Sequence, residues 1–125
     1  MKGKLVESKF SLLRRAFGPP DRRFENPDGS ATSRVFKPRP IDAGKLSVDV
    51  KELTSIEKAI IDKSKFILYE IKVAKVEEIG LATIHDPLSL DPDGIENPAH
   101  ALIVTIDNDD DITPGLLAKA SNRIF

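Results

Sequence analysis

The segment SRVFKPRPIDAGKLSVD, residues 33–49, joins two stretches of strand-like composition and sets where the chain enters its sheet. Pro38 and Pro40 fix their own φ angles and keep the residues before them out of the helical region, so we expect an extended loop. Gly44 permits a turn after that loop. The alternation of apolar and polar residues over 45–50 predicts a half-buried strand. A stiff, charged loop that leads into a strand is a suitable position for a functional site.

The composition is that of one globular domain. The chain has 125 residues, of which 40% are hydrophobic and 31% are charged, and its net charge is −1. This balance gives no global signal for nucleic acid or an anionic membrane, so any basic site is local. The absence of cysteine excludes disulfides, zinc–thiolate sites and cysteine nucleophiles, and two histidines are too few for a histidine-only metal cage. We therefore expect no metal and no cofactor.

The cellular location is predicted from the absence of a membrane-spanning segment and of a signal peptide in the hydrophobic pattern. No apolar run approaches the roughly 20 residues that a membrane-spanning helix needs, and the first residues lack the apolar core of a signal peptide. We expect a soluble, cytoplasmic protein of bacterial type.

The N-terminal segment shows helical periodicity. Phe10, Leu13 and Phe17 stand at i, i+3 and i+7, and Gly18 with the two prolines after it ends the pattern. This predicts an amphipathic helix within residues 1–18, followed by an α+β domain over residues 19–125. Such a helix either packs on the core of the domain or docks on a partner or a second copy. We expect the second, namely self-association or partner binding.

Residues 19–125 predict a single compact α+β domain with a mixed, mostly antiparallel sheet of about four or five strands and short helices. Besides the strand over 45–50, apolar runs predict strands over 66–73, 81–85 and 99–106, with a short strand over 22–24. Helices are expected after a capping box formed by Thr54 and Glu57, over 74–80, and from Leu116. The proline- and aspartate-rich stretch 86–98 predicts a long loop.

Several short motifs occur in a fixed order: RRF at 22–24, FKPR at 36–39, LSVD at 46–49, EIGL at 78–81 and NPAHA at 97–101. With these motifs the chain resembles a family of small bacterial proteins of uncharacterised activity, over most of residues 21–123. It is similar, more weakly, to ADP-ribosyltransferase-like domains, which place an arginine or histidine on an early strand and a serine on the next. Ser47 fits that outline, whereas the late glutamate motif of those domains has no counterpart here. This second resemblance implies NAD as the first substrate to test.

The candidate ligand-binding residues are mostly cationic: Arg23, Arg34, Lys37, Arg39 and Asn97. Arginine binds phosphate through paired hydrogen bonds, so these residues favour a phosphate-bearing ligand or an acidic segment of a partner. The alternative for the arginine pair at 22–23 is a solvated edge. We expect the cationic loop and the residues around position 100 to converge beside the sheet.

The candidate catalytic residues are His100, as an acid–base group that titrates near neutral pH, and Ser47, as an orienting group. The alternative for His100 is a half-buried histidine whose ring is satisfied by loop backbone. The acidic run 107–111 lacks the spacing of a calcium loop and better suits the N-terminus of a helix.

Three functions follow from these residues. The first is a small binding or interaction module with a polar, basic site. The second is an enzyme that acts on a nucleotide such as NAD. The third is an accessory subunit of a larger bacterial complex. The residue types leave open whether the protein is an enzyme.

Overall fold

The computed structural model describes residues 3–39, 44–88, 97–104 and 112–125. The strands of these residues form one six-stranded sheet in the order β4-β5-β2-β1-β3-β6, antiparallel at each pairing. Their bounds are Ser11–Phe17 for β1, Leu46–Val50 for β2, Phe66–Lys72 for β3, Ala82–His85 for β4, His100–Val104 for β5 and Asn122–Arg123 for β6. The expected α+β class and the antiparallel sheet are confirmed, with slightly more strands than predicted.

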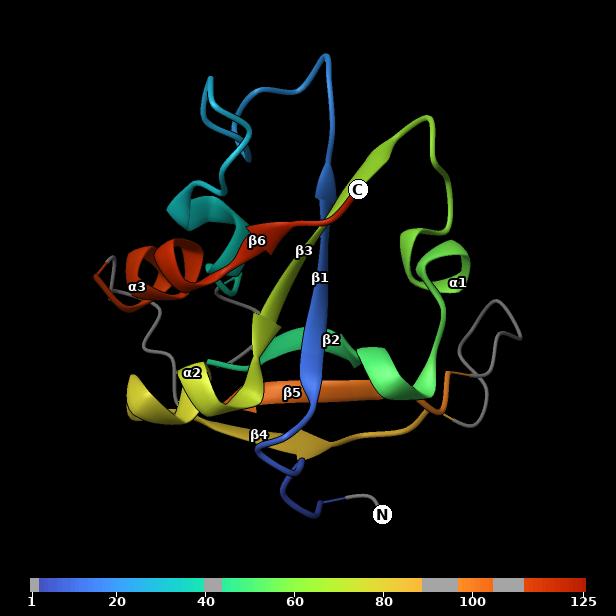
Figure 1. Cartoon of the computed structure of the whole chain (residues 1–125), viewed down its shortest axis with the longest axis vertical. Helices are drawn as coiled ribbons and strands as arrows, with labels where there is room; N and C mark the ends of the chain where they lie inside the picture. Colours follow the sequence, from blue (N-terminus) through green and yellow to red (C-terminus); the bar gives the residue numbers. More distant parts are fainter. Residues whose placement is uncertain (1–2, 40–43, 89–96, 105–111) are drawn as a thin grey trace.

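Short helices flank the sheet (Figure 1). The α-helices are α1 over Ile56–Ile60, α2 over Val73–Glu78 and α3 over Ile112–Ala120, and the 3-10 helices are η1 over Ser33–Phe36 and η3 over Lys51–Leu53. Buried residues of η1, α2 and α3 belong to the larger hydrophobic cluster, whereas α1 supplies a smaller cluster. Because the two clusters lie on opposite faces, the half of the sheet around β1 and β3 is covered on both sides.

The sheet changes direction at β1. This strand pairs with β3 over its whole length but meets β2 only at Leu12 and Leu13. Figure 1 shows the result: β1 and β3 run steeply, and β2, β5 and β4 cross below them. The two-residue junction therefore joins two halves of the sheet that point in different directions.

The predicted N-terminal helix is wrong, because Ser11–Phe17 is a strand in the interior of the sheet. Leu12 belongs to the larger cluster and Leu13 to the smaller one, so both sides of the strand are buried. The strand does not alternate between apolar and polar residues, because Leu12 and Leu13 are adjacent and two arginines follow them. The spacing of Phe10, Leu13 and Phe17 therefore matched a helix instead. The segment completes the core, so it cannot dock on a partner as a detachable helix, and position 18 does not separate two units.

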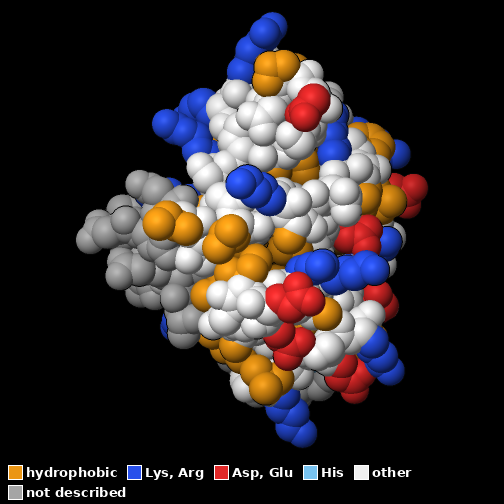
Figure 2. Space-filling model, turned by 60° about the vertical axis from the view of Figure 1, so that its left-hand side comes forward, with side chains coloured by type: hydrophobic (Ala, Val, Ile, Leu, Met, Phe, Trp, Pro, Cys, Tyr) orange, Lys and Arg blue, Asp and Glu red, His pale blue; other side chains and the backbone are white. Residues whose placement is uncertain are grey.

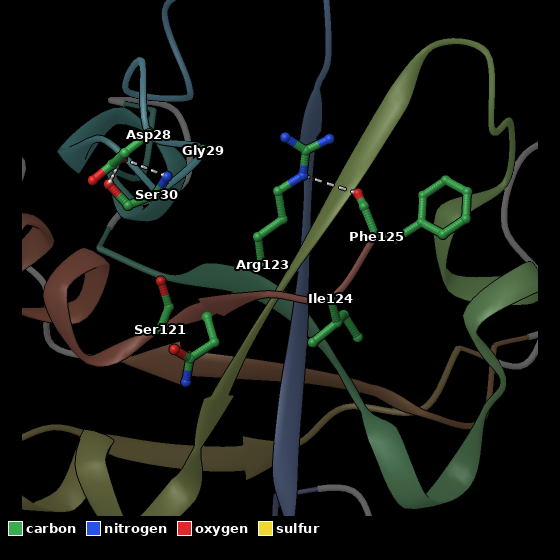
Figure 3. Close-up of a pocket in the computed structure, with 8 residues that line it drawn as sticks. Asp28, Gly29, Ser30, Ser121, Arg123, Ile124 and Phe125 are labelled. Atoms are coloured by element: carbon green, nitrogen blue, oxygen red, sulfur yellow. Dashed lines mark hydrogen bonds between the residues drawn. The ribbon is translucent and has the colours of Figure 1, made fainter.

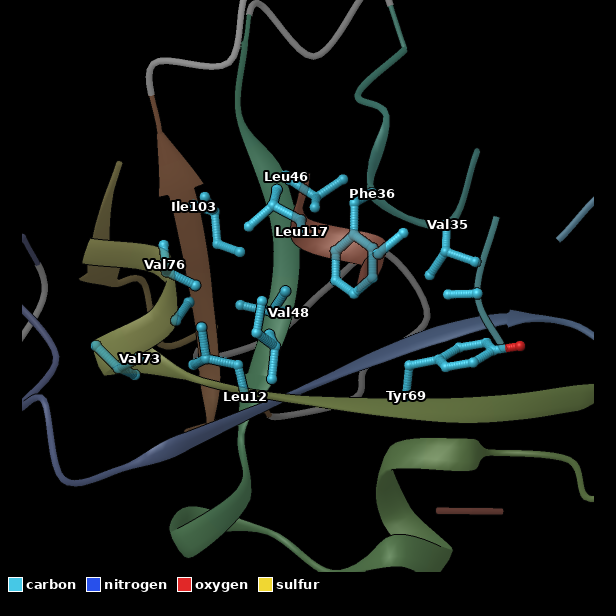
Figure 4. Close-up of a cluster of buried hydrophobic side chains, with 14 of the residues drawn as sticks. Leu12, Val35, Phe36, Leu46, Val48, Tyr69, Val73, Val76, Ile103 and Leu117 are labelled. Atoms are coloured by element: carbon cyan, nitrogen blue, oxygen red, sulfur yellow. The ribbon is translucent and has the colours of Figure 1, made fainter. Parts of the chain in front are cut away.

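The larger cluster lies on the face of the sheet that η1, α2 and α3 cover (Figure 4). Leu12, Val48, Tyr69 and Ile103 reach it from four different strands, and all four are at most 3% exposed. Phe36 of η1 is fully buried among them. Burial of a side chain of this kind contributes about 1.5–3 kcal/mol, so this cluster holds the 33–36 segment on the sheet.

Most local predictions are confirmed with small shifts. The strands predicted over 45–50, 66–73 and 81–85 appear as β2, β3 and β4, and Gly80 ends α2 with a φ of +97°. The cap of α1 is Ser55 rather than Thr54, since the Ser55 side chain accepts the Lys58 amide at 3.2 Å. Residues 22–24 form no strand. Residues 40–43, 89–96 and 105–111 lie outside the described residues, and with them parts of the predicted loops and the acidic run.

Candidate functional site

β2 and β5 carry the predicted acid–base residues on the face opposite the larger cluster. The register places Asp49 across from His100 and Ser47 across from Leu102. Side chains alternate between the faces of a strand, so Asp49 and Ser47 point away from the larger cluster. The other residues of β2 are buried in that cluster: Leu46, Val48 and Val50.

Asp49 and His100 form a close cross-strand pair. The amide of Val50 donates to the carbonyl of Ala99 at 2.8 Å, which makes that neighbouring pair the hydrogen-bonded one. Asp49 and His100 are therefore a non-hydrogen-bonded pair, with Cα atoms about 4.5 Å apart and side chains closer than in the alternate pairs. The carboxylate of Asp49 thus stands beside the imidazole of His100.

The imidazole of His100 is held by Asp86, the residue directly after β4. Its Nδ1 atom lies 2.9 Å from the carbonyl oxygen of Asp86 and 3.2 Å from Oδ2 of the same residue. A carbonyl oxygen can only accept, so Nδ1 carries the proton and donates. The neutral ring then has its lone pair on Nε2, and no residue in the described part of the chain donates to that atom.

Asn97 connects the loop before β5 to β2. Its Nδ2 donates to Oδ1 of Asp49 at 2.8 Å, and its Oδ1 accepts the amide of Ala99 at 3.2 Å. The side chain therefore closes the chain onto the end of β2 and also orients the Asp49 carboxylate. We call Asp49, Asp86, Asn97 and His100 the His100 cluster.

Arg15 supplies positive charge near the Asp49 side of the cluster. Its Nη1 donates to the carbonyl of Ala59 at 3.0 Å, and its guanidinium lies 5.1 Å from the centre of the Phe66 ring. Burial lowers the pKa of Arg15, and the nearby charge of Asp49 acts in the opposite direction. Arg15 remains charged under any ordinary condition, so it partly balances Asp49.

Ser47 shares a face with His100 but does not contact it. It is exposed and stands diagonal to His100, a position that separates the two residues by about 7–8 Å. A nucleophile and its general base need to lie within roughly 2.6–3.2 Å of each other. Ser47 therefore does not form a nucleophile–base pair with His100.

Arg23 is already bound to a carboxylate. Its Nη2 lies 2.6 Å from Oδ2 of Asp21, and its Nε contacts both carboxylate oxygens. These side-chain hydrogen bonds, together with the hydrogen bond from the Arg23 backbone, lower the pKa of Asp21 from 3.8 to about 2. A ligand phosphate would have to displace Asp21 before it could bind Arg23.

Arg34, Lys37 and Arg39 follow one another along η1 and the segment after it. Arg34 and Arg39 are exposed and Lys37 is half-buried. Lys37 follows η1 in extended backbone, with φ −94° and ψ 119°. On the face drawn in Figure 2, Lys and Arg side chains are scattered among hydrophobic and acidic ones rather than gathered in one patch.

The η1 segment, which carries Arg34, does not converge with the His100 cluster, contrary to expectation. Arg14 fixes the position of η1, because its Nε donates to the carbonyl of Val35 and its Nη1 to the carbonyl of Ser47, both at 2.8 Å. Thus η1 lies beside the start of β2, whereas Asn97 contacts the other end. Because η1 also packs into the larger cluster, it lies on the opposite face of the sheet from His100.

His100 and Asn97 were predicted from the sequence as site residues, and the structure brings these two together. Asp86 and Asp49 were not among the predicted site residues. Both carboxylates stand at the ends of predicted strands, where antiparallel pairing places the start of β5 next to the end of β2 and β4. Strand order was the missing signal, since it cannot be read from local alternation.

The described part of the chain contains no group of three or more acidic or histidine side chains that could hold a metal ion. Across the same residues, no helix has the length and apolar character needed to cross a membrane. No family model, curated protein or solved structure matches this chain.

Proposed function

We propose that the protein is a small binding module whose ligand engages the His100 cluster through hydrogen-bond donors. The observation that carries this proposal is the contact of His100 Nδ1 with the carbonyl of Asp86 at 2.9 Å. Because the one N–H of the neutral imidazole donates in that contact, the other nitrogen, Nε2, is an acceptor. The Asp49 carboxylate beside it also only accepts.

Two acceptors at one strand end define the chemistry of the ligand. A group that presents several N–H donors, such as a guanidinium, an amine or an amide edge, can bind both the Nε2 atom and the carboxylate. A phosphate would face the negative charge of Asp49 and Asp86 there. If the protein binds a phosphate-bearing ligand or an acidic segment, we place that ligand at Arg34, Lys37 and Arg39, on the other face of the sheet.

Acid–base catalysis is the second candidate function. It is favoured by the 3.2 Å contact between Asp86 Oδ2 and His100 Nδ1, since a carboxylate at Nδ1 orients an imidazole and stabilises its protonated form. His100 would then take a proton at Nε2. Incubation with NAD, followed by assay for released nicotinamide, tests the nucleotide version of this function.

Nuclear magnetic resonance titration tests the binding proposal with simple probes. Methylguanidinium chloride at millimolar concentration should shift the signals of His100 and of residues near Asp49, whereas inorganic phosphate should not. The matched variant is His100→Asn, because asparagine keeps an N–H donor at the position of Nδ1 and removes the acceptor at Nε2. The methylguanidinium shifts should disappear in this variant. Shifts that survive in His100→Asn, or phosphate shifts centred on His100, would refute the proposal.

A further inference from the structure

We propose that β6 is a docking edge, and that an extended, basic segment of a partner polypeptide binds along it as an added strand. This site goes beyond the His100 cluster and uses none of its residues. It is the groove lined by Asp28, Gly29 and Ser30 on one side and by residues 121–125 on the other. We call it the β6 groove (Figure 3).

β6 is the last strand of the described sheet and pairs there with β3 alone. Asn122 is paired with Glu70, and the Ile124 amide donates to the carbonyl of Leu68 at 3.0 Å. In an antiparallel ladder, the backbone of alternate residues points to the same neighbour. The backbone N–H and C=O of Arg123 therefore point away from β3, and neither has a partner among the described residues.

The other edge of the sheet is not available in this way. The N-terminal segment lies along β4, where the amides of Gly3 and Val6 donate to the carbonyls of His85 and Thr83, and the His85 amide donates to the carbonyl of Lys4. An unpaired strand edge is a template for pairing with another chain. Within the described sheet, β6 is the strand that has such an unpaired edge.

The walls of the β6 groove are held in place. The hydroxyl of Tyr69 donates to the carbonyl of Gly29 at 3.0 Å, and Arg123 Nη1 donates to Oε2 of Glu25 at 2.5 Å. Figure 3 shows Arg123 between the Asp28–Ser30 turn and Phe125, whose carbonyl accepts its Nε. The cavity between the walls has a volume of about 550 Å³, which gives room for a short extended segment.

The charge of the groove favours a basic occupant. Two charged side chains line it, and Arg123 is neutralised by Glu25. The carboxylate of Asp28 accepts hydrogen bonds from the hydroxyl and the amide of Ser30, and these bonds lower the pKa of Asp28. Asp28 therefore stays ionised and exposed beside a free strand edge. A lysine or arginine on the added strand would complement it.

The probe for this site is the peptide Ac-Thr-Val-Lys-Val-Thr-NH2, titrated into the labelled full chain and followed by amide chemical shifts. We expect a saturable shift at the amide of Arg123, as its N–H acquires an acceptor. The same peptide with glutamate in place of lysine should bind several-fold more weakly, and so should the lysine peptide to the Asp28→Asn variant. A peptide methylated on its backbone nitrogens should not bind, because it cannot donate to the free carbonyl of Arg123.

Two variants of Arg123 distinguish the contribution of its backbone to peptide binding from that of its side chain. Arg123→Gln keeps the edge N–H but lacks the guanidinium that contacts Glu25, as does Arg123→Pro, so it is the matched reference against which the binding of Arg123→Pro is measured. Arg123→Pro removes that N–H but none of the hydrogen bonds to β3, and should weaken binding about tenfold. If Arg123→Pro does not fold, the methylated peptide decides the question on the original chain.

Three results would overturn the proposal: no saturable shift at Arg123, equal affinity for the glutamate and lysine peptides, or undiminished binding of the methylated peptide. Solution mass measured without peptide provides the remaining check. A dimer in which the amide of Arg123 is protected from hydrogen exchange would assign the edge to a second copy, and would also overturn it.

Discussion

His100 and the backbone of Asp86 bind each other in both directions, once through the backbone of His100 and once through its ring. The amide of Asp86 donates to the carbonyl of His100 at 2.9 Å, and Nδ1 of His100 donates back to the carbonyl of Asp86 at 2.9 Å. The first bond continues the β4–β5 ladder by one step, and the second adds a side-chain bond to it. The ring is thus held by the sheet itself, with Nε2 left to accept.

Asn97 should contribute to stability through Asp49. Replacement of Asn97 by alanine removes a 2.8 Å hydrogen bond to a carboxylate and a second bond to the Ala99 amide, which together should cost about 1–3 kcal/mol of unfolding free energy. Urea unfolding of Asn97→Ala, Asp49→Ala and the double variant measures the coupling between the two residues. Strictly additive effects would show that the Asn97–Asp49 contact does not form in solution.

Arg14 should be required for the position of η1. Its guanidinium binds the carbonyls of Val35 and Ser47 at once, so Arg14→Met should lower the unfolding free energy by roughly 1.5–3 kcal/mol. Arg14→Lys is the matched control, because it keeps the charge but lacks the fork that reaches two carbonyls. We expect lysine to recover less than half of the loss in urea unfolding. Full recovery by lysine would mean that charge alone matters at this position.

Replacement of Thr83 by valine should make the protein more stable. The Thr83 hydroxyl is buried in β4 and has no hydrogen-bond partner among the described residues, and a buried polar group without a partner costs about 1–3 kcal/mol. Thr83→Val keeps the shape and the preference for strand, so it should raise the melting temperature. A lower melting temperature would indicate that the hydroxyl binds an internal water or another group.

Asp21 should give the protein a pH-dependent contact at its surface. Hydrogen bonds from the Arg23 side chain and backbone lower the pKa of Asp21 to about 2, below its usual 3.8. A lowered carboxyl pKa means that the contact stabilises the fold fully above pH 3.8, and that this contribution is lost as the pH falls towards 2. Carboxyl carbon signals should show this low midpoint, and Arg23→Gln should move it back towards 3.8. An unchanged midpoint would mean that Arg23 does not bind Asp21.

A sequence pattern can identify a strand when one of its sides is buried and the other faces solvent. β2 alternates between buried and solvent-facing residues, and β3 ends in such a pattern, so both are evident from the sequence. β1 is not, because Leu12 and Leu13 are buried on opposite faces and the run has no period of two. β6 has only two residues, too few for any period.

The sequence allowed some residues of the candidate site to be predicted, but not how those residues are arranged in space. The position of His100 after a long loop marks it as a candidate, but its partners depend on strand order. β2 pairs with β5 although the two are separated by β3 and β4 in the chain. The same order places the cationic segment around Arg34 on the opposite face, which no local pattern reveals.

The tautomer of His100 tests the central claim most directly, since the proposed ligand chemistry depends on which nitrogen carries the proton. Nitrogen-15 chemical shifts of the imidazole, recorded at a pH where the ring is neutral, distinguish the two forms. We predict a protonated Nδ1 and an unprotonated Nε2 that becomes hydrogen-bonded when methylguanidinium is added. A neutral ring with its proton on Nε2 would contradict the account, because the site would then offer a donor where we place an acceptor.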